Sequence, residues 1–363
     1  MTLQGSANIL DDVAAMGRAD SEGMLGRIAE LPGQVLEGWH ISRELELPWD
    51  APRSVAILGM GGSAIAGDLV KGIWADRISA PVEVLRGYDL PAWVGPQTLV
   101  IASSKSGDTE ETLRQLETAL SRRCPVVCVT SGGVLRNVAQ AASLPLAVFP
   151  DRGAPRTATG WSLGIIAGVL ERAGVLELDV AEIEQGVADA VATDACCASD
   201  VPTADNAAKQ LAWSLVDRFI VVSGSGFLAP VARRWKSQLN ENGKAVAVFE
   251  ELPEATHNTV VGFEQPESLR DHLGLVFLRS ALEHPRNAIR AQLVGDLVET
   301  GQIWHTFVDV QGEGVLGQTL SAMVMGDYVS VYVAFMYAVD PTPIEVITHI
   351  KEQLALSDQA GPE

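Results

Sequence analysis

The chain has 363 residues, more than one domain of average size, and suits two units that can each bury a core. Hydrophobic residues make up 47% and charged residues 20%, which is the composition of an ordinary soluble enzyme. The formal net charge of −20 opposes binding to nucleic acid or to anionic membranes, because both require a basic surface, so we expect neither partner.

The first 45 residues predict a helical segment that packs against the rest of the chain. Asp20 or Ser21 would cap a helix whose apolar residues recur at helical spacing, namely Met24, Leu25, Ile28 and Leu31. From residue 46 onward, short apolar runs alternate with helical stretches. These runs are 54–60, 81–87, 98–104, 126–131 and 146–150. The alternation predicts a doubly wound parallel sheet, which we assign to residues 46–200 as a first domain.

A second cycle begins after the acidic, alanine-rich stretch near residues 182–205. Its apolar runs are 218–226, 244–251, 273–280 and 303–310, and helices are expected over 228–240 and 316–337. The predicted fold is therefore α/β with two tandem doubly wound parallel-sheet domains. We place the boundary near residue 200, so the second domain spans 201–363 with the carboxyl-terminal helices.

The segment ILGMGGSAIAGD, residues 57–68, predicts a strand that runs through a glycine turn into a helix. Gly61 and Gly62 would let the backbone approach a ligand, while Ser63 and the first helical amides would offer donors to an anion. The segment also fits the dinucleotide pattern G-x-G-x-x-A, so a Rossmann oxidoreductase is an alternative. Against it, the next predicted strand ends in Arg86, where that fold needs an acidic ribose ligand. A glycine turn alone is also compatible with a purely structural role.

A second turn, ASSKSGDTEETL, residues 102–113, again follows an apolar strand and opens a helix. Ser104, Ser106 and Thr109 place three hydroxyls and several free amides at one helix N-terminus, which suits a phosphate monoester. Capping of this helix would account for one hydroxyl and not for three. The two turns together predict a site for a phosphate group.

These segments resemble a known superfamily. GMGGSAIAGD followed by S-x-S-G-x-T-E-E-T is similar to the SIS sugar isomerases. Residues 239–264, LNENGKAVAVFEELPEATHNTVVGFE, and 340–354, DPTPIEVITHIKEQL, resemble the bifunctional phosphoglucose/phosphomannose isomerases. The resemblance implies two tandem SIS-type domains and a cofactor-free enzyme that interconverts a sugar 6-phosphate aldose and its ketose. Glucose 6-phosphate and mannose 6-phosphate would both yield fructose 6-phosphate through an enediol.

The resemblance also implies roles for residues of this sequence. The substrate phosphate would be held by Ser63, Ser104, Ser106 and Thr109, with amides near Gly61 and Gly62. Glu241 would be the catalytic base, Arg156 would polarise the enediol, and His257 would assist ring opening. Lys351 would act at the ring oxygen, and Thr342 would lie where the pocket leaves room for both epimers. In the family's homodimer, His257 would come from the neighbouring subunit.

The residues alone leave these roles open. Isomerisation needs a base, a group that stabilises the enediolate and an acid for ring opening, so carboxylate, arginine and histidine are suitable types. Glu241 is expected at the C-terminus of a helix, where the dipole disfavours a carboxylate. The alternatives are a solvated surface glutamate, a hydrogen-bonded loop His257, and a Lys351 that only stabilises a helix end.

Two residues depart from the family pattern in the second turn. Lys105 and Asp108 stand where a tyrosine and an asparagine are common. Lys105 adds a cation beside the expected phosphate, and Asp108 would offset it. We expect these changes to alter the affinity for phosphate more than the binding mode.

We expect neither a cofactor nor a metal. Glu250, Glu251 and Glu254 with His257 lack a recognisable ligand spacing, and an enediol route with glutamate needs no metal. The four cysteines show neither metal-ligand nor disulfide spacing, so we expect reduced structural thiols. The sequence shows no signal-like segment at its start and no apolar run long enough to span a bilayer, so we expect a cytoplasmic protein.

Two competing functions differ from this interpretation. A non-catalytic SIS module that senses sugar phosphates would keep the phosphate turns and lack the base, and the presence of Glu241 with His257 argues against it. Another SIS enzyme, such as an aminosugar-phosphate isomerase, would share all these features. The physiological sugar and the oligomeric state stay open at this point.

Overall fold

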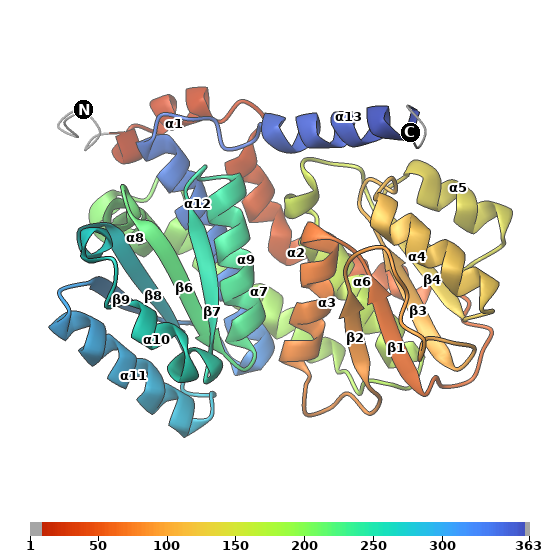
Figure 1. Ribbon diagram of the computed structural model, residues 1–363. Helices are drawn as coiled ribbons and strands as arrows, with labels where there is room; N and C mark the ends of the chain where they lie inside the picture. Colours follow the sequence, from red (N-terminus) through yellow and green to blue (C-terminus); the bar gives the residue numbers. More distant parts are fainter. Residues whose placement is uncertain (1–8, 360–363) are drawn as a thin grey trace.

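Two parallel β-sheets with their helices account for residues 9–359, the part of the chain that the computed structural model describes (Figure 1). The first sheet has the strand order β2-β1-β3-β4-β5 and the second β7-β6-β8-β9, and every pairing is parallel. The strands are β1 (Ser54–Leu58), β2 (Val82–Leu85), β3 (Thr98–Ser103), β4 (Val126–Thr130), β5 (Leu146–Val148), β6 (Phe219–Ser225), β7 (Ala247–Leu252), β8 (Leu273–Arg279) and β9 (Trp304–Asp309). The predicted pair of parallel-sheet α/β domains is confirmed.

Helices cover both faces of each sheet and link the two sheets. The α-helices are α1 (Val13–Ala19), α2 (Met24–Arg43), α3 (Gly61–Ile73), α4 (Glu110–Ser121), α5 (Gly133–Ala141), α6 (Thr159–Arg172), α7 (Val180–Cys197), α8 (Ala207–Leu215), α9 (Leu228–Glu241), α10 (Thr259–Gly262), α11 (Pro285–Thr300), α12 (Gly314–Met336) and α13 (Glu345–Gln359). Short segments of 3-10 helix are η2 (Ile9–Asp11), η3 (Pro155–Thr157), η4 (Thr203–Asp205), η5 (Glu254–His257) and η6 (Glu267–His272).

The strand β1 shows why the first domain can be predicted from the sequence. Side chains alternate along a strand, so Val55 and Ile57 pack with α3 and α6, while Ala56 and Leu58 pack with α4 and α5 on the other face. Because both faces are buried, the strand is one continuous apolar run in the sequence.

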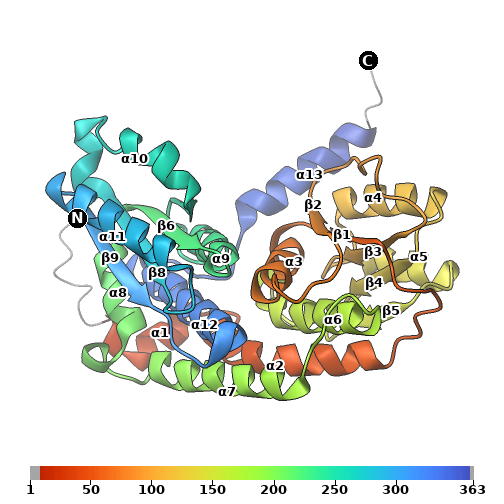
Figure 2. The same cartoon turned by 90° about the horizontal axis from the view of Figure 1, so that it is seen from below.

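Helices α2 and α7 run along one side of both sheets (Figure 2). The start of α2 agrees with the predicted cap, since the Asp20 carboxylate accepts hydrogen bonds from the amides of Met24 at 2.6 Å and Leu25 at 2.9 Å. Its crossing with α6 is very close, because a Cβ atom added at Gly164 would lie 2.0 Å from the Val35 carbonyl oxygen. Helix α2 also packs against α7 and α12 and so contacts both halves of the chain, and the boundary near residue 200 stays a prediction.

The long helix α12 forms the centre of the second domain. Within residues 9–359 it is the single helix with the length and apolar composition that crossing a membrane requires. However, 94% of its apolar window is buried inside the protein. Its apolar surface is therefore covered by the fold itself, by α7, α8 and α9 among others.

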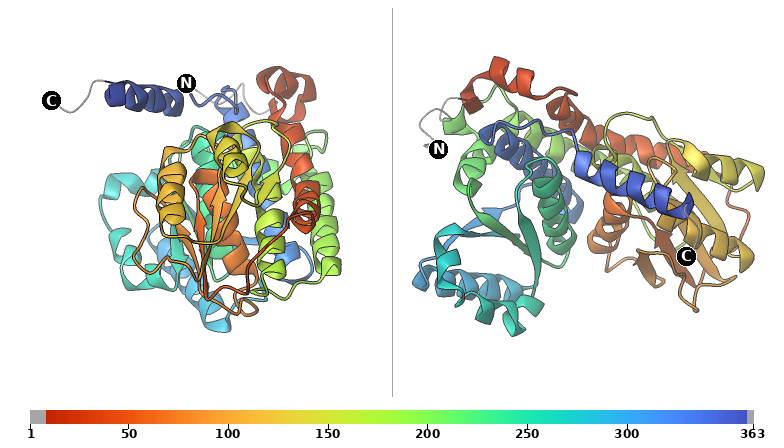
Figure 3. Two further views of the ribbon diagram at one scale, coloured as in Figure 1. Left: turned by 90° about the vertical axis from the view of Figure 1, so that its right-hand side faces the viewer. Right: turned by 45° about the horizontal axis from the view of Figure 1, so that its top comes forward.

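The carboxyl edge of the first sheet and the amino edge of the second sheet lie on the same side of the molecule. The turns after β1, β3 and β5 lie at the carboxyl edge of the first sheet. Helix α9 follows β6 and runs back along it, so its end lies at the amino edge of the second sheet. The end of α9 meets η3, which follows β5, through a hydrogen bond from Arg156 to Asn242. Near this shared face, α13 projects from the body of the molecule past the first domain (Figures 1 and 3).

Candidate active site

Two turns rich in glycine and hydroxyl side chains meet at the carboxyl edge of the first sheet, because β1 and β3 are neighbours in it. The first turn joins β1 to α3. Its Gly61 has a φ of +49°, a backbone conformation that favours glycine, and the buried Ser63 follows two residues later. In the second, between β3 and α4, the Ser104 hydroxyl lies 2.8 Å from the Thr109 hydroxyl and accepts the Gly107 amide at 3.1 Å. We call these segments, 59–63 and 104–109, the glycine–hydroxyl turns.

Neither helix that follows a glycine–hydroxyl turn is capped by a side chain. Met60 and Thr109 occupy the N-cap positions of α3 and α4, and neither makes a side-chain capping bond. The exposed Ser106 hydroxyl accepts only the amide of Asp108, at 3.3 Å. The simple capping interpretation is therefore wrong for Thr109. The N-termini of both helices are therefore left without a side-chain cap, which suits the binding of an anion.

The two unusual residues of the second turn are both bound by neighbouring segments, Lys105 by a loop and Asp108 by the start of α5. Lys105 forms an ion pair with Asp151, and the hydrogen bond from Lys105 lowers the pKa of that carboxyl. The carboxylate of Asp108 accepts the Val134 amide at 2.9 Å, at the start of α5. Each charge thus has a partner within the protein, and neither is left to repel or attract a ligand alone.

Arg156 lies beside the first of these turns. A Cβ atom added at Gly62 would come within 3.0 Å of the Pro155 carbonyl oxygen, so the turn and η3 are in contact. The Arg156 side chain is 3% exposed. Burial lowers its pKa, and the negative charges of Glu241 and Asp327 oppose that shift.

Hydrogen bonds hold the Arg156 guanidinium on two of its edges. Nε donates to Asn242 Oδ1 at 2.5 Å, and Nη2 donates to the carbonyl oxygens of Pro341 at 3.0 Å and Thr342 at 2.8 Å. Nη1 lies 3.4 Å from Glu241 Oε2, a long contact for an ion pair. Of five donors, three are fully used, and the two on Nη1 face the Glu241 carboxylate and the space beside it.

Glu241 is the last residue of α9, as the sequence predicts, and its side chain is 29% exposed. The neighbouring Lys244 donates from Nζ to the carbonyl oxygens of Glu241 at 2.5 Å and Pro341 at 3.0 Å. Burial lowers the pKa of Lys244, and the positive charge of Arg156 lowers it further. Two cations therefore offset the helix dipole that disfavours the carboxylate.

Asn242 and Lys244 were not singled out in the sequence, although both belong to the N-E-N-G-K segment. Asn242 is fully buried and binds Arg156 through Oδ1. Asn242 directly follows the proposed base and Lys244 lies three residues after it, so their closeness to Glu241 at the predicted helix end is the signal that could indicate them. Their roles depend on partners far away in the chain.

Thr342 lies within this cluster. Its carbonyl oxygen binds Arg156, while its own amide donates to Asp340 Oδ1 at 2.9 Å. Its hydroxyl is buried and has no hydrogen-bond partner among the described residues. A buried hydroxyl without a partner is costly, and no described residue relieves that cost.

His257 and Lys351 are not brought to the cluster. His257 ends η5, which follows β7 at the carboxyl edge of the second sheet, whereas Glu241 lies at the amino edge. The 14 residues of α9 separate these edges, which corresponds to about 20 Å at 1.5 Å per residue. Lys351 is exposed on the projecting α13. Within one chain, neither residue contacts Glu241 or Arg156.

The second domain has a turn after β6 that matches the first turn by position, and the protein itself fills it. Ser225 donates its hydroxyl hydrogen bond to Oε1 of Glu283, whose Oε2 accepts the Ser280 amide at 3.1 Å. Burial raises the pKa of Glu283, and the bonds from Ser225 and Ser280 oppose that shift. A carboxylate thus occupies the place where an anion would bind. Of these two corresponding turns, the one in the first domain is therefore the one left open to an anion.

The acidic side chains near His257 are used in local hydrogen bonds. Glu250 accepts from the Thr259 hydroxyl at 2.9 Å, and Glu254 accepts from Asn258 Nδ2 at 2.7 Å. Within residues 9–359, no group of three or more His, Cys, Asp or Glu side chains could hold a metal ion. All four cysteines are free thiols, and burial raises the pKa of Cys128 to about 12.

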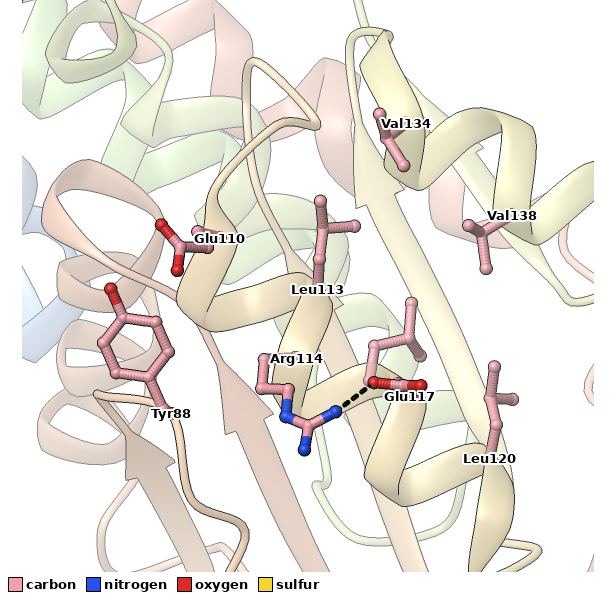
Figure 4. A pocket seen from close by; sticks show the side chains of 9 residues that line it. Tyr88, Glu110, Leu113, Arg114, Glu117, Leu120, Val134 and Val138 are labelled. Carbon is pink, nitrogen blue, oxygen red and sulfur yellow. Dashed lines mark hydrogen bonds and ion pairs between the residues drawn. The ribbon is translucent and has the colours of Figure 1, made fainter. Parts of the chain in front are cut away.

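A separate groove of about 590 Å³ lies on the outer face of the first domain, between α4 and α5 (Figure 4). Apolar side chains such as Leu113 and Val134 line it, and an ion pair of 2.5 Å joins Arg114 to Glu117 at its edge. None of the residues predicted for phosphate or sugar binding lines this groove. Its apolar walls do not suit a sugar phosphate.

Comparisons with known proteins find relatives along most of the chain. Residues 204–354 match the family described as the bacterial phospho-glucose isomerase C-terminal SIS domain. The bifunctional phosphoglucose/phosphomannose isomerase of Caldicellulosiruptor bescii is 34% identical over 92% of this chain and 99% of its own length. The enzyme with the same name from Aquifex aeolicus is 30% identical over 83% of this chain and 90% of its own.

Solved structures are similar in fold. A hypothetical protein of Thermus thermophilus superimposes with a TM-score of 0.74 at 18% identity, over 99% of this chain and 95% of that chain. The C-terminal domain of a glucosamine-fructose-6-phosphate aminotransferase from Francisella tularensis has a TM-score of 0.70 at 15% identity, over 90% and 99%. At these identities the likeness concerns the arrangement of two α/β domains.

Proposed function

This chain belongs to the family of bifunctional phosphoglucose/phosphomannose isomerases, and on that premise we propose how its residues carry out the reaction. Membership makes the chain an aldose–ketose isomerase that acts on sugar 6-phosphates. The proposed reaction interconverts glucose 6-phosphate or mannose 6-phosphate with fructose 6-phosphate. The observation that carries the assignment of the site is the pair of Glu241 Oε2 and Arg156 Nη1, 3.4 Å apart beside the glycine–hydroxyl turns.

The glycine–hydroxyl turns bind the substrate phosphate in this proposal. Two uncapped helix N-termini direct amides to one place, and Ser63, Ser104, Ser106 and Thr109 add hydroxyl donors. Gly61 and Gly62 leave the backbone amides accessible because no side chain covers them. The sugar would extend from this anchor toward Arg156, whose turn touches Gly62.

Glu241 acts as the base that moves a proton between C2 of the aldose and C1 of the ketose. The electrons of the broken C–H bond pass into the adjacent carbonyl, and the resulting enediolate carries its negative charge on oxygen. The hydrogen bonds of Nε and Nη2 fix the orientation of the Arg156 guanidinium. Nη1 can therefore donate to the enediolate oxygen without a change in the orientation of the side chain. No cofactor enters this scheme.

Ring opening requires the two residues that stand apart within one chain. We assign His257 to the site of a neighbouring subunit in a homodimer, since α9 separates it from its own Glu241. Lys351 lies on α13, which begins directly after the segment that binds Arg156. A movement of α13 over the site would bring Lys351 to the ring oxygen.

Dual specificity follows from the enediol. Glucose 6-phosphate and mannose 6-phosphate differ only in configuration at C2, and removal of the C2 proton erases that difference. Both epimers react with one base if the intermediate can rotate about C2–C3, which needs space. We assign the edge of that space to Thr342, whose carbonyl oxygen binds Arg156.

A coupled assay with purified protein tests the function. Wild type should convert both epimers to fructose 6-phosphate. Glu241→Gln keeps the shape of the side chain and loses the base, so kcat should fall by at least about a thousandfold while substrate binding persists. Glu254→Gln, at the first residue of η5, is the matched control and should keep near-normal kcat.

Three results would contradict this proposal in different ways. Near-normal kcat in Glu241→Gln would exclude Glu241 as the base. Activity on glucose 6-phosphate alone would exclude dual specificity and leave the isomerase assignment intact. Turnover of an aminosugar 6-phosphate in preference to both would favour the alternative enzyme class.

We also propose a cytoplasmic location, which the burial of α12 supports.

A further inference from the structure

Beneath the site, an ion pair between Arg234 of α9 and Asp327 of α12 is buried in the second domain. Arg234 Nη2 lies 2.5 Å from Asp327 Oδ2, and the side chains are 2% and 3% exposed. Removing two charges from water is costly, and well-packed apolar residues usually stabilise a fold as much or more. Stability therefore gives little reason for this pair to exist.

Arg234 makes two further bonds, and both cross from the second domain to the first. Nη2 also donates to the carbonyl oxygen of Arg156 at 3.2 Å, and Nη1 donates to the hydroxyl of Thr159 at 2.9 Å. Thr159 opens α6, directly after the turn that carries Arg156. The ion pair thus holds the backbone of Arg156.

A second chain of hydrogen bonds leads from Asp327 to the side chain of Arg156. The Ser330 hydroxyl donates to the Asp327 carbonyl oxygen at 2.6 Å and accepts from Asn242 Nδ2 at 2.9 Å. Asn242 in turn accepts from Arg156 Nε at 2.5 Å. The Asp327 carboxylate therefore supports the Arg156 carbonyl through Arg234, while the Asp327 backbone carbonyl supports the guanidinium through Ser330 and Asn242.

We infer that Arg234 and Asp327 are positioning residues for Arg156. The inference rests on the proposed function, in which Arg156 Nη1 stabilises the enediolate. A hydrogen-bond donor that is already in position does not have to reorient when negative charge develops on the enediolate oxygen. A small displacement of such a donor lowers the reaction rate. The buried network sets that position through three hydrogen bonds, to the Arg156 carbonyl oxygen, to the Thr159 hydroxyl and from Arg156 Nε. Neither Arg234 nor Asp327 touches the substrate.

The first test is Arg234→Lys, with Arg233→Lys as the matched control. Lysine keeps a positive charge beside Asp327, but one ammonium cannot also bridge to the Arg156 carbonyl and Thr159. We expect kcat to fall about tenfold to a hundredfold, while KM stays within about twofold because the phosphate anchor is untouched. Arg233 is partly exposed and contacts Asp68, so its change should leave both constants unaltered. Unchanged kcat in folded Arg234→Lys would contradict the inference.

The second test separates positioning from a merely structural role. The double variant Arg234→Met/Asp327→Leu replaces the pair with apolar side chains and should unfold at a denaturant concentration close to that of wild type. Its kcat should nevertheless fall about tenfold or more, with little change in KM. Wild-type kcat in this folded double variant would overturn the inference. If the double variant does not fold, the Arg234→Lys result decides.

A double-mutant cycle that combines Arg234→Lys with Arg156→Lys distinguishes failure of the inference from failure of the proposed function. If Arg234 and Asp327 act through Arg156, adding Arg234→Lys to Arg156→Lys should lower kcat no further. Additive losses would contradict the positioning role and leave Arg156 in place. Full kcat in Arg156→Lys alone would instead overturn the role of Arg156 in the proposed reaction.

Discussion

Arg156 and Glu241 owe their chemistry to different surroundings. Arg156 is almost fully buried, and three of its donors bind Asn242 and the carbonyl oxygens of Pro341 and Thr342. Glu241 is partly exposed at the end of α9, and Lys244 binds the carbonyl oxygen beside it. A fixed cation therefore faces a carboxylate that has room to move, which suits a base that must follow a proton between two carbons.

Thr342→Gln should reduce the reaction of mannose 6-phosphate more than that of glucose 6-phosphate. Glutamine fills the space beside the buried hydroxyl and restricts rotation of the enediol. We expect kcat/KM for the two epimers to diverge by about fivefold or more, which corresponds to about 1 kcal/mol. Thr342→Val removes the hydroxyl and keeps the volume, so it should affect both epimers alike. Equal losses in Thr342→Gln would show that this residue does not set specificity.

At the scale of elements, close backbone approach decides how the helices pack. The crossing of α2 and α6 brings the Val35 carbonyl oxygen against Gly164. Elsewhere on α2, Gly33 has open space around it. Glycine is therefore required for close packing at Gly164 and is not required at Gly33. Alanine substitutions at the two positions should have opposite effects on stability.

Gly164→Ala should destabilise the protein by about 1–3 kcal/mol or more, because the added Cβ meets backbone atoms that cannot rotate away. The control, Gly33→Ala, should stabilise by about 0.5–1 kcal/mol, since alanine favours a helix and meets nothing there. Urea unfolding followed by circular dichroism measures both. A Gly164→Ala variant as stable as wild type would show that α2 and α6 are not so tightly packed.

Glu283 in the second domain makes stability depend on pH. Burial raises its pKa in the folded protein, so the folded state keeps this proton to a higher pH than the unfolded chain does. Stability contributed here is therefore lost as pH rises from the usual glutamate pKa of about 4.3 through the raised folded value. Glu283→Gln removes this loss, and its free energy of unfolding relative to wild type should increase from pH 4 to pH 7.

Unfolding titrations at several pH values check this expectation. Glu299→Gln, at an exposed position near the end of α11, is the control and should show a difference from wild type that stays constant with pH. If the difference for Glu283→Gln also stays constant, the carboxyl of Glu283 does not titrate differently in the folded state.

For the molecule as a whole, the position of His257 is the main constraint. His257 and Glu241 lie at opposite edges of the second sheet. A site that needs both must take them from two chains, which a symmetric dimer can supply twice.

Mixing two inactive variants tests this arrangement. In a mixed dimer of Glu241→Gln and His257→Ala subunits, one site would pair an intact Glu241 with an intact His257 from the other chain. Random exchange after unfolding and refolding together should restore roughly a quarter of wild-type activity, because half of the dimers are mixed and each has one intact site. Each variant refolded alone is the control. No recovery above the sum of the controls would place His257 in its own chain's site or outside the reaction.

The sequence by itself determined the order of strands and helices, the two glycine–hydroxyl turns and the end of α9 at Glu241. These features are local, since apolar runs, turn residues and caps act over a few neighbouring positions. Only the tertiary structure decided that Arg156 is held by Asn242 and by the carbonyl oxygen of Thr342, which stand 86 and 186 residues further along the chain. It also decided that Glu283 fills the second turn and that α9 separates His257 from Glu241. Such contacts arise when packed helices bring distant segments together, and no short sequence pattern encodes which buried donor will meet which acceptor.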